Sequence, residues 1–333
     1  MADPTQTGLF GHRWGAYIKN ETSGSEIWAD RVQRVEPTVD LRTTPYYELG
    51  RVGKIGVTQD PASFRFTAEQ NLANHELAYV LAGKNPNPTA AQTFQLGDFI
   101  GKNITAYALG RDEAGTIDRE VYLTNLRLTE LSYRFTIRDA IATTFGLQGT
   151  VGRWYTSGSL IHTAWGTLDD TSPGGVHGKE ARVWFNTSGS TAASRAFRLQ
   201  SFGIRAMFPV TPVAELGRRD LVGQLADSPD VTVDLDVLAS DFQPLDKFFA
   251  AGGGHYDLNT PAALFDGYVR VFDPDLAEAL SVISSFKLEN LRLTSGTPMR
   301  AQVRGLSTMR YSLTVAKEST TDSGGLIVSN RNQ

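Results

Sequence analysis

The sequence predicts a mainly β protein built from two tandem copies of one domain, each an antiparallel β-sandwich or barrel with one α-helix. Two observations predict this fold class. Short segments return in the same order at an offset of 165 to 168 residues within a chain of 333. Between these segments, apolar and polar residues alternate with period two, as in half-buried antiparallel strands.

Three matches indicate the duplication: TPYYELGR at 44–51 with TPVAELGR at 211–218, LTNLRLT at 123–129 with LENLRLT at 288–294, and TSGS at 22–25 with 187–190. The first match keeps six of its eight residues. Three matches in order at nearly one offset are hard to produce by chance. A repeat this long is a whole domain rather than a solenoid unit.

The duplication predicts four parts: a first copy at 12–150, a linker at 151–177, a second copy at 178–317 and a polar C-terminal tail at 318–333. Each copy is long enough to bury its own core. The linker is rich in Gly, Ser and Thr but also contains tryptophan, so we expect it to lie along a domain surface. We expect the loop at 83–97 and the polar termini to become ordered only on contact with a neighbour.

Alternating segments predict the strands 14–20, 31–41, 63–67, 100–109, 119–129 and 133–138 in the first copy, and 181–186, 197–208, 231–237, 266–272 and 284–294 in the second. A helix at 71–82 is expected to close one end of the first sandwich, and a helix at 241–251 the second. In the second helix, Ser240 and Gln243 form a capping-box pattern, Pro244 lies in the first turn, and the glycines from Gly252 end it.

The composition excludes several functions. Lys and Arg number 32 against 36 Asp and Glu, without a basic run, so the chain lacks the charge pattern of a tight nucleic-acid binder. Cysteine is absent, which excludes disulfides and thiolate metal sites. No signal sequence or membrane-length apolar run is present, so we expect a soluble protein made in a cytoplasm.

No pattern of catalytic residues is present. The five histidines are scattered without metal-ligand spacing: His12, His75, His162, His177 and His255. Gly97–Asn103 has the wrong spacing for a phosphate loop, and we interpret it, like Gly50–Gly53, as a pair of turn glycines. We therefore predict that the protein is not an enzyme and has no catalytic, cofactor-binding or metal-binding residues and no cofactor.

The order of elements carries a family resemblance. Each copy has strand pairs, a central helix and closing strands that contain Asn125-Leu126-Arg127-Leu128 or Asn290-Leu291-Arg292-Leu293. In this order, residues 12–317 resemble the tail tube proteins of long-tailed bacteriophages, of the duplicated kind that forms trimeric, pseudo-hexameric rings. The resemblance implies a structural virion protein whose rings stack into a hollow tail tube, with an inner sheet joining neighbours around a channel.

The resemblance also implies partners. These are further copies of the chain, the tail terminator, tape measure and distal tail or baseplate proteins, and double-stranded DNA that passes through without specific binding; no membrane is involved. The protein would be made in the host cytoplasm and located in the phage tail. Six units with about four strands each would form a ring on the order of 40 to 45 Å across, which leaves roughly 30 to 35 Å for a duplex of about 20 Å.

Two other functions stay open from the sequence. A sliding clamp also closes duplicated domains around DNA, but it should present basic residues, commonly on helices, whereas each copy here has one helix. A carbohydrate-binding or hydrolytic β-sandwich would need clustered exposed aromatics with carboxylates. The five tryptophans are instead dispersed along the sequence: Trp14, Trp28, Trp154, Trp165 and Trp184.

Overall fold

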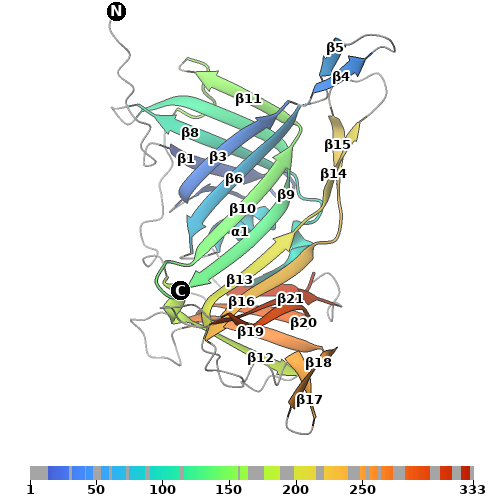
Figure 1. The fold of residues 1–333 in the computed structure, drawn as a ribbon. Coiled ribbons are helices and arrows are strands. Elements are labelled where there is room, and N and C mark those ends of the chain that lie inside the picture. Colours follow the sequence, from blue (N-terminus) through green and yellow to red (C-terminus); the bar gives the residue numbers. More distant parts are fainter. Residues whose placement is uncertain are drawn as a thin grey trace, which may run out of the picture.

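The computed structural model describes residues 14–29, 32–41, 43–47, 54–59, 62–72, 75–86, 91–112, 116–156, 158–163, 176–187, 199–214, 221–238, 248–252, 255–261, 264–272, 282–300, 308–316 and 324–330. In this part of the chain the protein is mainly β with antiparallel pairing, as predicted (Figure 1). No helix among these residues combines the length and the apolar character needed to cross a bilayer.

The first half of the chain contains β1 (Trp14–Asn20), β2 (Glu26–Ala29), β3 (Val32–Asp40), β4 (Thr43–Tyr47), β5 (Lys54–Gln59), β6 (Ser63–Asn71), α1 (Glu76–Leu81), β7 (Gln92–Gln95), the 3-10 helix η2 (Leu96–Phe99), β8 (Ile104–Arg111), β9 (Ile117–Thr136), β10 (Ala142–Gly149) and β11 (Val151–Thr156). The second half contains the 3-10 helix η3 (Gly178–Glu180), β12 (Ala181–Thr187), β13 (Leu199–Met207), β14 (Val210–Ala214), β15 (Leu221–Ala226), β16 (Asp230–Leu238), β17 (Phe249–Gly252), β18 (His255–Pro261), β19 (Phe265–Phe272), β20 (Val282–Arg300), β21 (Thr308–Val315) and β22 (Leu326–Asn330).

The two halves have the same strand order. Hydrogen-bonded neighbours follow β1-β8-β9-β10-β6-β3 in the first half and β12-β19-β20-β21-β16-β13 in the second. Each half contains one long strand that pairs with two neighbours in turn. In the first half, β9 pairs first with β8 and then with β10. In the second half, β20 pairs first with β19 and then with β21. The buried faces of these layers form one core that continues through both halves.

The strand register agrees between the halves even where it is irregular. The ladder of β3 with β6 shifts between Val32 and Arg34, and that of β13 with β16 shifts 167 residues later, between Leu199 and Ser201. Asn125 and Asn290 occupy the left-handed region, with φ of 55° and 49°, and they are the described non-glycine residues with positive φ. Bulges and left-handed residues are specific features of a strand pair, so the halves share a detailed backbone plan.

One of the three sequence matches falls out of register. Asn20 lies opposite Ile104 in the first half, and Thr187 lies opposite Phe265 in the second, so these two positions are equivalent at an offset of 167. Thr22 and Thr187, the first residues of the TSGS match, therefore do not occupy equivalent backbone positions. The domain boundaries themselves stay a prediction.

The first predicted helix is present but shorter than expected. Helix α1 spans Glu76–Leu81, because strand β6 continues to Asn71. Asn20 of β1 donates from Nδ2 to the carbonyl oxygens of Val80 and Leu81 at 3.0 and 3.2 Å, which ties the end of the helix to the sheet. Most of the second predicted helix, 241–251, lies outside the described residues, and its last part belongs to β17, paired with β18.

Three segments expected to be loop, linker or tail contain strands. In the loop at 83–97, β7 buries Phe94 completely, and Leu96 follows it into the core. In the expected tail, β22 pairs with β20 and with β7 and buries Leu326 and Val328. In the expected linker, β11 pairs with β9. These strands are short and complete the edges of longer ladders, so their own composition predicts them poorly.

Candidate assembly interface

The two halves meet edge to edge and form one continuous sheet. Strand β13 pairs with the second part of β9, from Ser201 opposite Thr136 to Met207 opposite Glu130. Because β9 also pairs with β10, the sheet runs without a break from β3 to β20 (Figure 1). A second contact, β22 with β7, joins the halves on the other layer. The joint is therefore made by backbone ladders as well as by side chains.

An aromatic cluster fills the interior of this joint. His75 of the first half is 3% exposed, and its Nε2 lies 2.6 Å from Oγ of Ser284 in the second. Its ring makes edge contacts with Phe94, Tyr133 and Phe286, at centroid distances of 5.6 to 5.9 Å. Burial lowers the pKa of His75 to about 3, so the ring is neutral. This histidine and serine are enclosed in the core, where no substrate reaches them.

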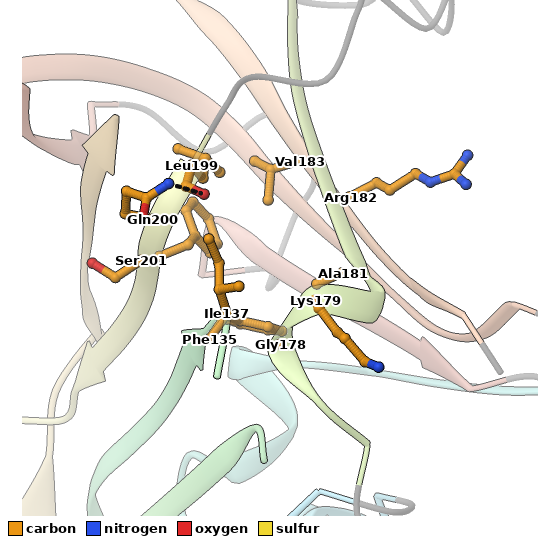
Figure 2. A pocket seen from close by; sticks show the side chains of 11 residues that line it. Phe135, Ile137, Gly178, Lys179, Ala181, Arg182, Val183, Leu199, Gln200 and Ser201 are labelled. Carbon is orange, nitrogen blue, oxygen red and sulfur yellow. Dashed lines mark hydrogen bonds between the residues drawn. The ribbon is translucent and has the colours of Figure 1, made fainter. Parts of the chain in front are cut away.

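A pocket of about 240 Å³ lies where β13 approaches the end of β9 (Figure 2). Its walls are Phe135 and Ile137 on one side and the residues from Leu199 to Phe202 on the other. The charged side chains of Lys179 and Arg182 extend away from it. The lining is largely apolar and contains no carboxylate, which suits packing between two units better than catalysis.

The outward face of the large sheet is polar and nearly neutral. It is formed by the side chains of β3, β6, β9, β13, β16, β20 and β21 that point away from the core, and we call it the polar face. Its described charged residues include seven arginines, Arg34, Arg65, Arg127, Arg134, Arg205, Arg292 and Arg310, and seven carboxylates, Glu36, Asp40, Glu69, Glu130, Asp230, Asp234 and Asp236.

Several of these charges pair on the face itself. Arg205 contacts Glu130 at 2.9 Å across the joint, and Arg310 contacts Asp236 at 3.0 Å. Exposed pairs of this kind contribute little to stability. Their consequence is electrostatic: at each of these pairs a carboxylate already opposes the arginine, which weakens its attraction for a polyanion.

In the described part of the chain, three hairpins form two-stranded sheets apart from the large sheet, and two of them, unlike β17 with β18, lie at equivalent places in the two halves. The pairs β4 with β5 and β14 with β15 form separate two-stranded sheets, each directly after β3 or β13 (Figure 1). The best-preserved repeat, TPYYELGR or TPVAELGR, begins in β4 or β14 and runs into residues outside the described ones. Tyr47 is 65% exposed and Leu225 is 66% exposed. Tyr47 is one of the two motif positions that differ between the copies, and Leu225 lies outside the motif, so it is exposed apolar side chains on equivalent hairpins that point to contact with a partner.

The histidines do not form a site. His162 bonds to the buried Glu120, with Nδ1 2.8 Å from Oε1, and packs against Tyr17 and Tyr107. This contact fastens the segment after β11 to the first half. His177 makes an isolated bridge, and His255 lies in β18. His12 lies outside the described residues. Among those residues, no group of three or more His, Cys, Asp or Glu could hold a metal ion.

The segment Gly97–Asn103, which was compared with a phosphate loop, forms a turn, as interpreted. Leu96–Phe99 forms η2, in which the carboxylate of Asp98 accepts from the backbone N–H of Gln95 at 2.9 Å. Gly101 has φ of 75°, a value that favours glycine. Gly50–Gly53 lies outside the described residues.

The tryptophans are less dispersed in space than in sequence. Trp14 and Trp154 line one pocket of about 380 Å³ with the first residues of β3. The pairing of β11 with β9, which the sequence did not predict, brings Trp154 to this place. Trp154 is 61% exposed, and the pocket lining contains no carboxylate. The pocket therefore lacks the acidic groups of a glycoside-hydrolysing site.

Neither a protein-family model nor a curated protein matches this sequence. Among solved structures, a chain from the cryo-EM structure of the anti-feeding prophage (AFP) baseplate, 6-fold symmetrised, is similar at a TM-score of 0.34 and 9% identity. The match covers 46% of this chain and 99% of that chain. A likeness at this level carries no argument, so the function is inferred from the interface described above.

Proposed function

We propose that this protein is a structural virion protein of a phage, whose chains close into trimeric, pseudo-hexameric rings that stack into a hollow tail tube for DNA. The observation that supports it most is the edge-to-edge joint of two similar units in one chain. The two units use different edges in this contact, so the contact is heterologous. A heterologous contact can repeat from unit to unit until the units close a ring or form a helix.

The strand count agrees with a passage for DNA. Each half supplies four strands to the continuous sheet, β3, β6, β10 and β9 or β13, β16, β21 and β20. Three chains would give about 24 strands and a backbone ring on the order of 40 to 45 Å across. Side chains on the inner face would leave room for a duplex of about 20 Å.

The polar face suits the lumen of such a tube. Its opposed charges are interspersed, and among its described residues the arginines and the carboxylates balance. Non-specific affinity for DNA grows with each phosphate that a cation neutralises. A nearly neutral lumen would let DNA move without holding it, whereas a sliding clamp would need a basic inner surface.

The two hairpins suit contact between stacked rings. They leave the sheet at equivalent places in both halves and carry exposed apolar side chains with the preserved motif. In a ring of six similar units, they would present six similar projections to the next ring. We assign ring stacking to them in place of the loop at 83–97, because that loop contains β7 within the fold.

Sedimentation velocity over a wide concentration range tests the proposal. The chain has a mass of 36.3 kDa, and we expect a species of three chains at low concentration and much larger assemblies at high concentration. A monomer that persists throughout the range would overturn the proposal.

A further inference from the structure

Two edges of the large sheet, β3 and the second part of β20, are equivalent to the two edges that pair inside the chain, β13 and the second part of β9. Strand β13 pairs with β16 on one side and with β9 on the other. Its equivalent in the first half, β3, pairs with β6 alone among the described strands. The second part of β9 pairs with β10 and β13, whereas the equivalent part of β20 pairs with β21 alone in this part of the chain.

Side chains that are exposed at the open edge have equivalents that are buried at the internal joint. By strand register, Val39 is equivalent to Ala206, and Trp154 is equivalent to Val328. Val39 is 53% exposed and Trp154 is 61% exposed, while both equivalents at the joint are fully buried. An exposed edge with large apolar side chains is unfavourable for an isolated chain and is normally covered.

The two pockets described above are also equivalent. Leu199–Phe202 of the pocket at the joint correspond to Val32–Val35 of the pocket with Trp154. At the joint, Phe135 and Ile137 of the preceding unit close one wall. In the open pocket that wall is missing, and its volume is about 380 Å³ rather than 240 Å³.

From these three correspondences we infer that β3 of one chain pairs with the second part of β20 of a second copy, in the register of the internal joint. Met207 lies opposite Glu130 at the joint, and the offsets of 167 and 165 residues convert this pair into Asp40 opposite Ser295. By the same conversion, Thr38 lies opposite Thr297. The inference rests on the proposed ring, and it specifies which edges form it and in what alignment.

Disulfide cross-linking tests the alignment, because the chain has no cysteine of its own. We expect the double variant Asp40→Cys with Ser295→Cys to form covalent dimers and trimers on mild oxidation, visible on a non-reducing gel. Directly opposed residues in an antiparallel pair have Cα atoms about 4.5 to 5.5 Å apart, within disulfide range. The matched control, Met207→Cys with Glu130→Cys, has the same pair geometry and should link within one chain.

Two further variants distinguish the alternatives. The pair Thr38→Cys with Ser295→Cys is displaced by two residues and should link at least tenfold more slowly. Asp40→Cys alone should not link, because the contact joins two different edges. Trimeric rings in which the displaced pair links faster would overturn the register while leaving the proposed function intact. Absence of both interchain links and trimers would overturn the register and the proposed function together.

Discussion

The burial of His75 at the joint between the halves makes the free energy of unfolding depend on pH. Its pKa is lowered to about 3 in the folded chain by burial, from an ordinary value near 6.5. Below pH 6.5 the unfolded chain takes up a proton that the folded chain refuses. We expect the free energy of unfolding to fall between pH 6.5 and 3, by up to about 1.4 kcal/mol per pH unit from this group.

Urea unfolding at pH 7, 5.5 and 4.5 measures this effect. The variant His75→Gln should be less stable than the parent at pH 7 and should lose less stability on acidification. The exposed His177 lies outside the buried cluster, so His177→Gln is the matched control for the substitution itself. An unchanged pH dependence in His75→Gln would contradict the buried neutral state.

A substitution at Trp154 should affect assembly without affecting the folding of the single chain. It is 61% exposed in the single chain, so Trp154→Lys should change the free energy of unfolding of the monomer by less than about 1 kcal/mol. At an interface, burial of a lysine in place of an aromatic anchor should weaken association at least a hundredfold. Sedimentation of Trp154→Lys beside Ile100→Lys, another exposed apolar position outside the open edge, tests this. If both variants lost the same amount of association affinity, Trp154 would contribute no more to the interface than another exposed apolar residue.

At the scale of single elements, alternation predicted many of the strands that carry it, but it did not predict β10 and β21, and it predicted β9 as two strands. Strands such as β6, β13 and β16 carry their own period of two, and a buried face specifies it. The strands β7, β11 and β22 are different. Each is four to six residues long and is stabilised by the edge it completes, so the signal lies in a partner distant in the sequence.

The interface was predictable only in outline. The repeat predicted two similar units, but the pairing of β13 with β9 depends on how two separate edges align, which no local pattern encodes. His75 appeared as one scattered histidine, because its partners Ser284 and Phe286 lie more than 200 residues away. The match of TPYYELGR with TPVAELGR, which keeps six of eight residues, indicated the duplication but did not predict the hairpins.

The hairpins can be removed without cutting the large sheet. Asp40 lies opposite Ser63 at the base of the first hairpin, so replacing residues 41–62 with Asn-Gly would connect β3 to β6 through a two-residue turn. In the second hairpin, the N–H of Asp227 donates to the carbonyl of Pro209 at 3.0 Å, which places the matching replacement at 210–226. We expect both variants to fold and form rings but to lose the tubes, as seen by electron microscopy. Tubes of normal length would show that the hairpins do not join rings.

At the scale of the whole molecule, a tube that conducts DNA should make only weak contact with it. The net charge is −4, and the described polar face has paired, interspersed charges. We expect assembled protein to bind duplex DNA only weakly in 50 mM salt, with a shallow dependence on salt concentration. Fluorescence anisotropy with a labelled duplex measures this. Tight binding with a steep slope would favour a clamp that holds DNA.

Negative-stain electron microscopy of the purified protein at high concentration tests the central claim most directly. We expect closed rings with six similar lobes from three chains, stacked into tubes with a lumen of roughly 30 to 35 Å, the width that follows from strand spacing and tilt. Uniform single particles of one chain, without rings or tubes, would contradict it.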